Sequence, residues 1–296
     1  MTRQEREAVL AFLKSNEAAE GLSLPEQRTR MDSLAAFFPV ADGTEVEPAT
    51  VGGIKGEWVR ARHARTDAVV LYLHGGGYVV GSPASHRHLL GAVSDMGGLV
   101  AFAPDYRLAP EHPFPAAVDD AVATYKGLLD SGFPANKIAI MGDSAGGGLT
   151  IAALVAARDK GLPMPACAVA ISPWADLTQS GETYRTRAGR DPMLAKKSLD
   201  ESAALYLGSA DARSPLASPV FADMKGLPPL LIQVGTEEVL HGDSQILAAR
   251  ADEAGVDVSL ENWGGMAHVW HIFHPLLGEG RDAIARIASF VKTHIA

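Results

Sequence analysis

The chain has 296 residues, of which 47% are hydrophobic, and a formal net charge of −9 at pH 7. This length allows one large α/β domain with a small accessory part. The negative charge, without any run of lysine or arginine, argues against a nucleic-acid partner, because phosphate binding needs clustered positive charge.

Cys167 is the only cysteine, so an intrachain disulfide cannot form. Its apolar neighbours, residues 166–171, indicate a buried small side chain rather than a nucleophile. The charged residues 1–7 lack the apolar segment of a secretory signal, and no apolar stretch is long enough to span a bilayer. We therefore expect a cytoplasmic protein without a membrane partner.

The first part of the chain shows two patterns in succession. Residues 1–43 carry apolar side chains at helical spacing, with a break at 21–25 that predicts two helices. Residues 44–62 alternate polar and apolar side chains around a Gly-Gly pair, which predicts two antiparallel strands.

From residue 68 onward, apolar runs alternate with helical patterns. The runs, typical of strands buried on both faces, lie at 68–73, 99–103, 137–141, 166–171, 229–234 and, more weakly, 258–261. The helical patterns between and after them lie at 86–96, 116–131, 145–160, 243–254 and 281–295. This alternation predicts the α/β class, with a mostly parallel central sheet flanked by helices.

Residues 176–213 interrupt this rhythm with a long polar segment that is expected to be partly helical. We expect residues 1–43 and 176–213 to form a small helical cap over a catalytic domain of residues 44–175 and 214–296. The apolar side chains of the first segment either cover the mouth of the site or only fill a helix–helix core. They are Phe12, Leu13, Leu34, Phe37 and Phe38.

Residues 142–146 have the form G-x-S-x-G, with Ser144 at the centre. The motif lies between an expected strand and an expected helix, as a nucleophile elbow requires. Such a sharp turn lifts the hydroxyl out of the sheet and leaves room only for glycine at 142 and 146. The alternative, a glycine-rich helix start without chemistry, does not account for the strand before it. We therefore expect Ser144 to be a nucleophile.

The sequence His74-Gly75-Gly76-Gly77 directly follows the run 68–73. Glycines let backbone N–H groups face a ligand without obstruction by a Cβ atom, as in the loops that supply oxyanion donors in lipases and esterases. We expect Gly75 and Gly76 to be such donors, joined by the N–H of Ala145, and His74 to pin the loop. A plain tight turn is the alternative.

A nucleophilic serine needs a base, and ten histidines are available. His268 follows two glycines after the last expected strand, where a loop can carry it over the edge of the sheet. His271 and His274 fall on the next helix and are expected to be partly buried.

Three carboxyl groups follow the run 229–234, namely Glu237, Glu238 and Asp243. Their spacing alone leaves open which of them orients the base, and a surface loop of acids is the alternative.

Three motifs taken in order resemble those of the bacterial hormone-sensitive lipase-like esterases, the family IV carboxylesterases of the α/β-hydrolase superfamily. They are HGGGY at 74–78, DYRLAPE at 105–111 and GDSAG at 142–146. The similarity runs from about residue 67 to 268 and extends into the N-terminal segment. It implies a capped α/β-hydrolase that cleaves short to medium acyl-chain esters without a cofactor. No metal is expected either, because the sequence has no cluster of His, Asp and Glu with the spacing of zinc ligands.

The resemblance also implies the roles of the site residues. Ser144 is the nucleophile, His268 is the base, and the oxyanion hole is formed by Gly75, Gly76 and Ala145. Asp105 and Arg107 of the second motif are implied to be structural supports.

The same resemblance selects the acid. Residues 238–243 read EVLHGD where many members have Asp-Pro-Leu followed by further acids. If residues 239–240 take the place of Pro-Leu, Glu238 takes the place of the triad aspartate. Glu237 is then expected to face solvent, and Asp243 to cap the next helix. The resulting prediction is a triad of Ser144, His268 and Glu238.

The same residues would also serve an amidase or a lactone hydrolase, and the sequence leaves these readings open because cap and pocket select the substrate. A non-catalytic receptor on the same fold is disfavoured, because both serine and histidine are present. The expected partner is a small-molecule ester, and a homodimer is left open.

Overall fold

A computed structural model describes residues 2–16 and 21–295. In these residues eight strands form one sheet in the order β1-β2-β4-β3-β5-β6-β7-β8. The strands are β1 (Glu45–Val51), β2 (Ile54–Arg60), β3 (Arg65–Leu73), β4 (Leu99–Pro104), β5 (Ile138–Asp143), β6 (Cys167–Ile171), β7 (Leu230–Gly235) and β8 (Val258–Trp263). β2 pairs antiparallel with both β1 and β4, and the other neighbours are parallel, which confirms the predicted fold class.

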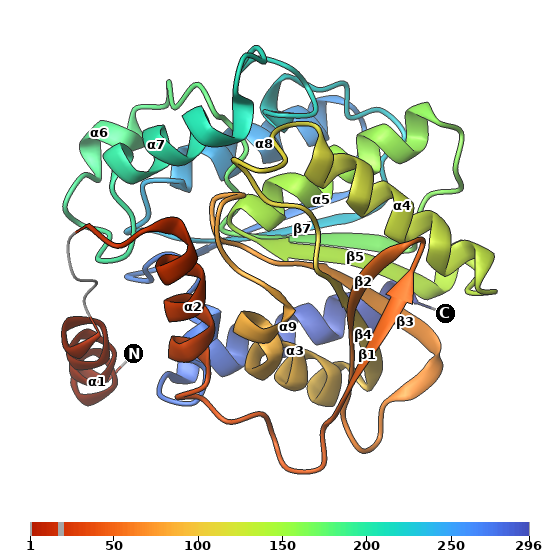
Figure 1. The fold of residues 1–296 in the computed structure, drawn as a ribbon, viewed down its shortest axis with the longest axis horizontal. Helices are drawn as coiled ribbons and strands as arrows, with labels where there is room; N and C mark the ends of the chain where they lie inside the picture. Colours follow the sequence, from red (N-terminus) through yellow and green to blue (C-terminus); the bar gives the residue numbers. More distant parts are fainter. Residues whose placement is uncertain (1, 17–20, 296) are drawn as a thin grey trace.

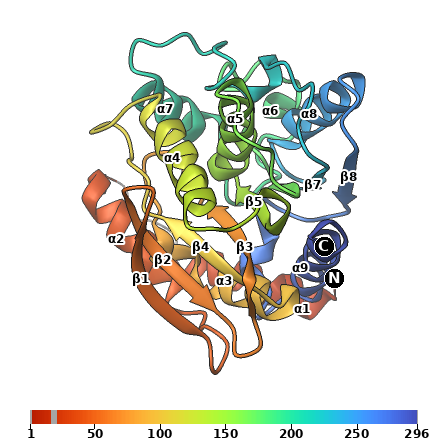
Figure 2. The ribbon, with the colours of Figure 1, turned by 90° about the vertical axis from the view of Figure 1, so that its right-hand side faces the viewer.

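Helices cover both faces of the sheet, because its strands are apolar on both sides. Figures 1 and 2 show α4 (Ala116–Asp130), α5 (Ala145–Asp159) and α8 (His241–Glu253) on one face. The other face carries α3 (Pro83–Gly97) and α9 (Gly278–His294). A separate hydrophobic core lies on each face of the sheet. Successive side chains of β3 point to opposite faces, as the pleat of a strand requires, so Leu71 is buried in one core and Tyr72 in the other.

The remaining helical elements are shorter or lie outside the two layers. They are α1 (Arg3–Ser15), α2 (Leu24–Ala35), α6 (Thr183–Thr186), α7 (Lys196–Leu207) and the 3₁₀ helices η1 (Ala135–Lys137), η2 (Pro219–Phe221) and η3 (Trp270–Phe273). The first two begin with capping boxes, in which a hydroxyl residue and a glutamate three residues on bond each other's backbone N–H. In the described part of the chain, no helix has the length and apolar character needed to cross a membrane.

Candidate active site

Ser144 lies at the turn between β5 and α5 in a conformation that is rare for a residue with a side chain, with φ 54° and ψ −122°. Its N–H donates to the carbonyl of Ile171 at 2.8 Å, and its own carbonyl accepts from the N–H of Trp174 at 2.9 Å. Because the surrounding chain enforces the turn in this way, the strain is held at the expected nucleophile.

The two outer glycines of the motif have no space for a side chain. A Cβ atom on Gly142 would lie 2.4 Å from the carbonyl oxygens of Leu73 and Gly146. One on Gly146 would lie 1.9 Å from the carbonyl oxygen of Leu73. The close approach of the elbow to the end of β3 therefore requires glycine at both positions.

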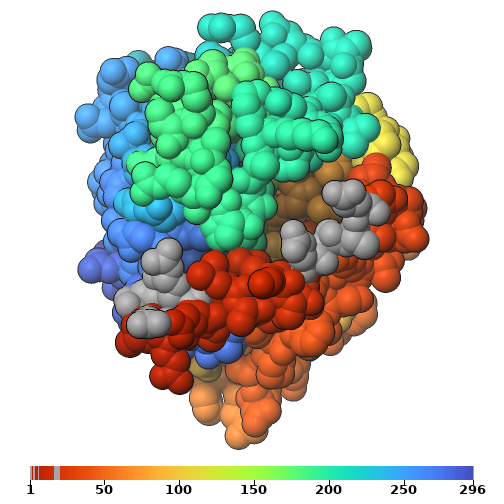
Figure 3. Space-filling model, turned by 90° about the vertical axis from the view of Figure 1, so that its left-hand side faces the viewer, coloured from red at the N-terminus to blue at the C-terminus, as the bar shows by residue number. Residues whose placement is uncertain are grey.

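Ser144 and His268 line one cavity of about 340 Å³. It lies between α2 and residues 176–213, two segments that meet on the face shown in Figure 3. Its walls combine groups from α2, the glycine loop (residues 74–77), the segment around α7 and the chain before α9. The residues that line it include Gln27, Met31, Gly76, Gly77, His86, Asp143, Met193, Leu194, Ser198, Leu199, Ser202, Val269 and Ile272.

Aromatic side chains near the N-terminus do not face this cavity. Phe38 is buried with Trp270 and Phe273, beside α9 and η3. Phe12 packs against Phe38 at 4.9 Å between ring centroids, whereas Phe37 is 64% exposed. Of the two alternatives for the apolar side chains of residues 1–43, the packed core therefore describes Phe12 and Phe38, and none of the five named earlier is among the described residues that line the cavity. The helix α2 contributes Gln27 and Met31 to the wall of the cavity.

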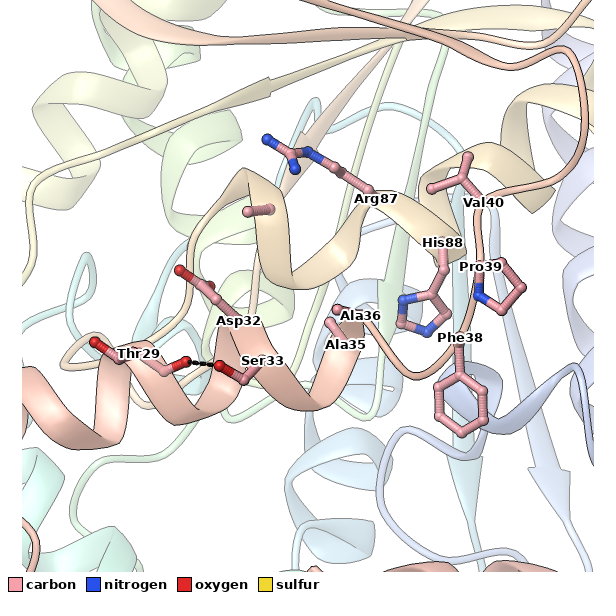
Figure 4. A pocket seen from close by; sticks show the side chains of 11 residues that line it. Thr29, Asp32, Ser33, Ala35, Ala36, Phe38, Pro39, Val40, Arg87 and His88 are labelled. Atoms are coloured by element: carbon pink, nitrogen blue, oxygen red, sulfur yellow. Dashed lines mark hydrogen bonds between the residues drawn. The ribbon is translucent and has the colours of Figure 1, made fainter.

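A larger and more open hollow of about 530 Å³ lies between α2 and α3 (Figure 4). Its polar side chains already have partners. Asp32 accepts from the hydroxyl of Ser82, Arg87 pairs with Glu57, and His88 bonds the carbonyl of Ile272. Its described lining does not combine a nucleophile with a base, whereas the cavity at Ser144 contains both Ser144 and His268. We therefore place the candidate site at Ser144.

His268 is buried, and its Nδ1 lies 2.9 Å from Oε2 of Glu238. Burial lowers the pKa of His268. The hydrogen bond and the charge of Glu238, with the charges of Asp191 and Asp143, outweigh burial and raise the pKa above its ordinary value. The imidazole is thereby held in one orientation at the wall of the cavity.

Glu238 is completely buried, and each of its two carboxylate oxygens has a hydrogen-bond partner. Oε1 accepts from the hydroxyl of Ser172 at 2.7 Å and from the N–H of Gly235 at 2.5 Å. Burial raises the pKa of Glu238, and the hydrogen bonds offset this only in part.

Ser172 was not predicted from the sequence. Its hydroxyl oxygen also accepts from the N–H of Val269 at 3.2 Å, so it joins the loop of the acid to the loop of the base. Its place directly after β6, at the edge where β5 and β7 also end, was the available signal.

The two neighbouring acids do not contact His268. Glu237 is about one-quarter exposed and pairs with Arg190 at 2.7 Å rather than facing solvent alone. Asp243 lies in the first turn of α8, but the capping position is Leu240, so the expected helix cap is wrong.

Asp243 instead connects α8 to residues 175–184. Its carboxylate accepts from the N–H groups of Ala175 and Asp176 and from the hydroxyl of Tyr184. Burial raises the pKa of Asp243 to about 8.

The glycine loop differs from expectation at one position. The N–H of Gly75 donates to Oδ1 of Asp143 at 3.0 Å, and Gly75 is not among the described residues that line the cavity. Gly76 and Gly77 do line it, with φ values of 119° and 63°. Ala145 opens α5, so its N–H has no acceptor within the helix. The expected role of Gly75 as an oxyanion donor therefore does not fit the structure, because its N–H already binds Asp143. Gly77 lines the cavity instead.

The other residues of the motifs support the loop. The ring of His74 stacks on Tyr106 at 4.2 Å, and the Tyr106 hydroxyl donates to the carbonyl of His74. The guanidinium of Arg107 binds Asp120 at 2.7 Å.

His271 is fully buried and bonds Gln233, so it does not reach the cavity. Among the described residues, no group of three or more His, Cys, Asp or Glu side chains has the arrangement of a metal site.

The family model described as alpha/beta hydrolase fold matches residues 70–272. The chain belongs to the α/β-hydrolase family. This hydrolase is similar to an acetyl-hydrolase of Streptomyces hygroscopicus, with 47% identity over 294 residues, which cover 99% of this chain and 98% of that protein.

Solved structures give the same result for this hydrolase. An esterase of the bacterial hormone-sensitive lipase family superimposes with a TM-score of 0.97 at 45% identity, over 100% of both chains. The esterase EstE5, in a crystal soaked with p-nitrophenyl butyrate, superimposes with a TM-score of 0.95 at 48% identity, over 100% of this chain and 99% of that chain. The family resemblance inferred from the motifs is confirmed.

Proposed function

We propose that this hydrolase is a serine carboxylester hydrolase that cleaves short to medium acyl-chain esters through an acyl-enzyme. The observation that carries the proposal is the buried pair of His268 and Glu238, 2.9 Å apart, at the same cavity as the strained Ser144. A nucleophile, a base and a third group that orients the base form the arrangement required for acyl transfer.

In the first step His268 takes the proton of the Ser144 hydroxyl, and the serine oxygen forms a bond to the ester carbonyl carbon. The alcohol leaves as its bond to that carbon breaks, with the proton supplied by His268. Water, deprotonated by His268, then attacks the acyl-enzyme and releases the acid. Glu238 holds the proton on Nδ1 of the imidazole, so that Nε2 is free to act as the base.

The oxyanion formed in both steps is stabilised by the N–H groups of Gly76, Gly77 and Ala145 in this proposal. Gly77 replaces Gly75, because the Gly75 N–H is bound to Asp143. Each such donor contributes on the order of 3–4 kcal/mol to stabilising the transition state.

The size of the cavity favours a small ester. Its volume of about 340 Å³ is near the lower end of the range for ligand pockets, and apolar side chains such as Met31, Leu194 and Leu199 line part of it. We propose that residues 1–43 and 176–213 act as the cap that limits it. The names of an acetyl-hydrolase and of an esterase crystal soaked with a butyrate ester agree with short acyl groups.

A panel of p-nitrophenyl esters from acetate to laurate tests the proposal, with Ser144→Ala as the control. We expect a burst of nitrophenol, the highest kcat/KM at acetate or butyrate, and a loss on the order of a million-fold in kcat for the variant. Activity of Ser144→Ala above about one per cent of the parent contradicts the serine mechanism, and a maximum at laurate contradicts the substrate class.

A further inference from the structure

A second buried acid–histidine contact lies behind the glycine loop. Asp143 precedes Ser144 and is 3% exposed, and its Oδ1 accepts from the hydroxyl of Tyr72 at 2.7 Å and from the N–H of Gly75 at 3.0 Å. Nε2 of His86, on α3, lies 3.3 Å from the same oxygen. His86 is 2% exposed and, like Asp143, lines the cavity.

We assign a proton to both ring nitrogens of His86, because each of them faces an acceptor. The hydroxyl of Ser85 donates to the carbonyl of Ser82 at 2.8 Å, so its oxygen is an acceptor for Nδ1 of His86, which lies 2.8 Å away. Nε2 faces the carboxylate of Asp143. An imidazole that carries both protons is an imidazolium, so in this assignment the contact is a buried ion pair.

The charges around the pair agree with this protonation. Burial lowers the pKa of His86, but the charge and the hydrogen bond of Asp143, with the charge of Asp32 on α2, raise it above its ordinary value. Burial raises the pKa of Asp143, yet its partners bring it down to about 2. The neighbouring imidazoles are neutral, because burial lowers the pKa of His74 to about 3 and that of His88 to about 4.

An unpaired carboxylate at residue 143 would oppose the proposed reaction. In the transition state, a negatively charged oxyanion forms on the substrate next to Ser144. A buried carboxylate at residue 143 would repel this oxyanion strongly, because charges interact more strongly away from water. A cation placed on the carboxylate cancels this repulsion. The same carboxylate fixes the N–H of Gly75, and thereby the direction of the next two residues of the glycine loop.

We propose that His86 and Asp143 are positioning residues whose ion pair holds the glycine loop and neutralises the carboxylate beside the reacting oxygen. This inference rests on the proposed function. It assigns the pair to the transition state rather than to substrate binding, so it acts on kcat and not on KM.

Three variants test the pair, namely His86→Gln, Asp143→Asn and the double variant. His86→Gln leaves a buried carboxylate without its cation, so we expect kcat to fall about 100-fold, with KM within about threefold. In the double variant two amides replace the ion pair without net charge, and we expect kcat to recover at least about tenfold over His86→Gln. The affinity for a trifluoromethyl ketone, which binds the serine as an oxyanion, is expected to follow kcat.

His88→Gln is the matched control, because His88 is a buried histidine on the same helix that bonds a carbonyl instead of a carboxylate. We expect its kcat within about threefold of the parent. Unchanged kcat in His86→Gln, or a double variant no better than His86→Gln, overturns the proposal. If His86→Gln does not fold, the double variant is compared with Asp143→Asn: similar kcat supports charge neutralisation, and a further large loss contradicts it. An active Ser144→Ala overturns the proposed function instead, so the two failures are distinguishable.

Discussion

The imidazole of His268 lies among three carboxyl groups, and this determines the expected pH profile. Glu238, Asp191 and Asp143 raise its pKa above the ordinary 6.5, and the base acts only when neutral. We therefore expect kcat/KM for an acetate ester to rise through a midpoint above pH 6.5, measured between pH 5 and 9. Glu238→Gln removes the largest of these charges, so its midpoint is expected at lower pH. An unshifted midpoint in that variant contradicts the assignment.

Two adjacent glutamates allow a direct test of the acid. Glu238 bonds His268, whereas Glu237 pairs with Arg190. We expect Glu238→Ala to lose about ten-thousand-fold in kcat, as in other triads, and Glu237→Ala to stay within about tenfold. Steady-state kinetics on p-nitrophenyl acetate measure both. The reverse order of the two losses shows that another group orients the base.

Single residues show where the sequence was sufficient and where it was not. Ser144 and Gly146 were predictable, because a local strand–turn–helix pattern specifies them. Gly75 was misassigned because its N–H meets Asp143, a residue 68 positions away in the chain. Asp243 was misassigned for the same kind of reason, since its partners lie on residues 175–184. Such long-range contacts leave no trace in local spacing.

At the scale of elements, α2 presents Met31 to the cavity. We expect Met31→Trp to reduce the free volume and to lower kcat/KM for hexanoate relative to acetate by about tenfold, because a few methylene groups in an apolar pocket decide such ratios. Phe37→Ala is the control, as Phe37 is 64% exposed and does not line the cavity. Equal chain-length profiles for Met31→Trp and the parent show that α2 does not limit the acyl group.

The long elements were predictable and the short ones were not. Apolar runs mark the strands of the parallel sheet because both of its faces are buried. The helix α3 begins at Pro83, three residues before the prediction, although Ser82 followed by proline is a typical helix start. The four-residue helices α6 and η3 are too short to show a period.

At the scale of the whole molecule, Asp243 makes stability depend on pH. Its pKa is about 8 in the folded chain and about 3.8 in the unfolded chain, so the folded state binds the extra proton between these values. Its contribution is therefore complete below about pH 4 and is lost as the pH rises through 8.

Asp243→Asn removes this titration and keeps the size of the side chain. Between pH 5 and 8.5 we expect the thermal midpoint of the parent to fall by roughly 10 °C more than that of the variant. The pKa difference changes the stability by about 4 kcal/mol over this range, and one kcal/mol corresponds to about 2–4 °C in a large domain. Calorimetry at both pH values measures the difference. Parallel curves for the two proteins contradict a titrating Asp243.

The conformation of Ser144 favours one residue for stability and another for the proposed activity. A glycine at that position would adopt a φ of 54° without strain, and so would stabilise the fold while removing the nucleophile. Selection for a stable chain alone would therefore erase the activity by a single substitution. In the proposed mechanism, the strained backbone at residue 144 is what places a hydroxyl group at this turn.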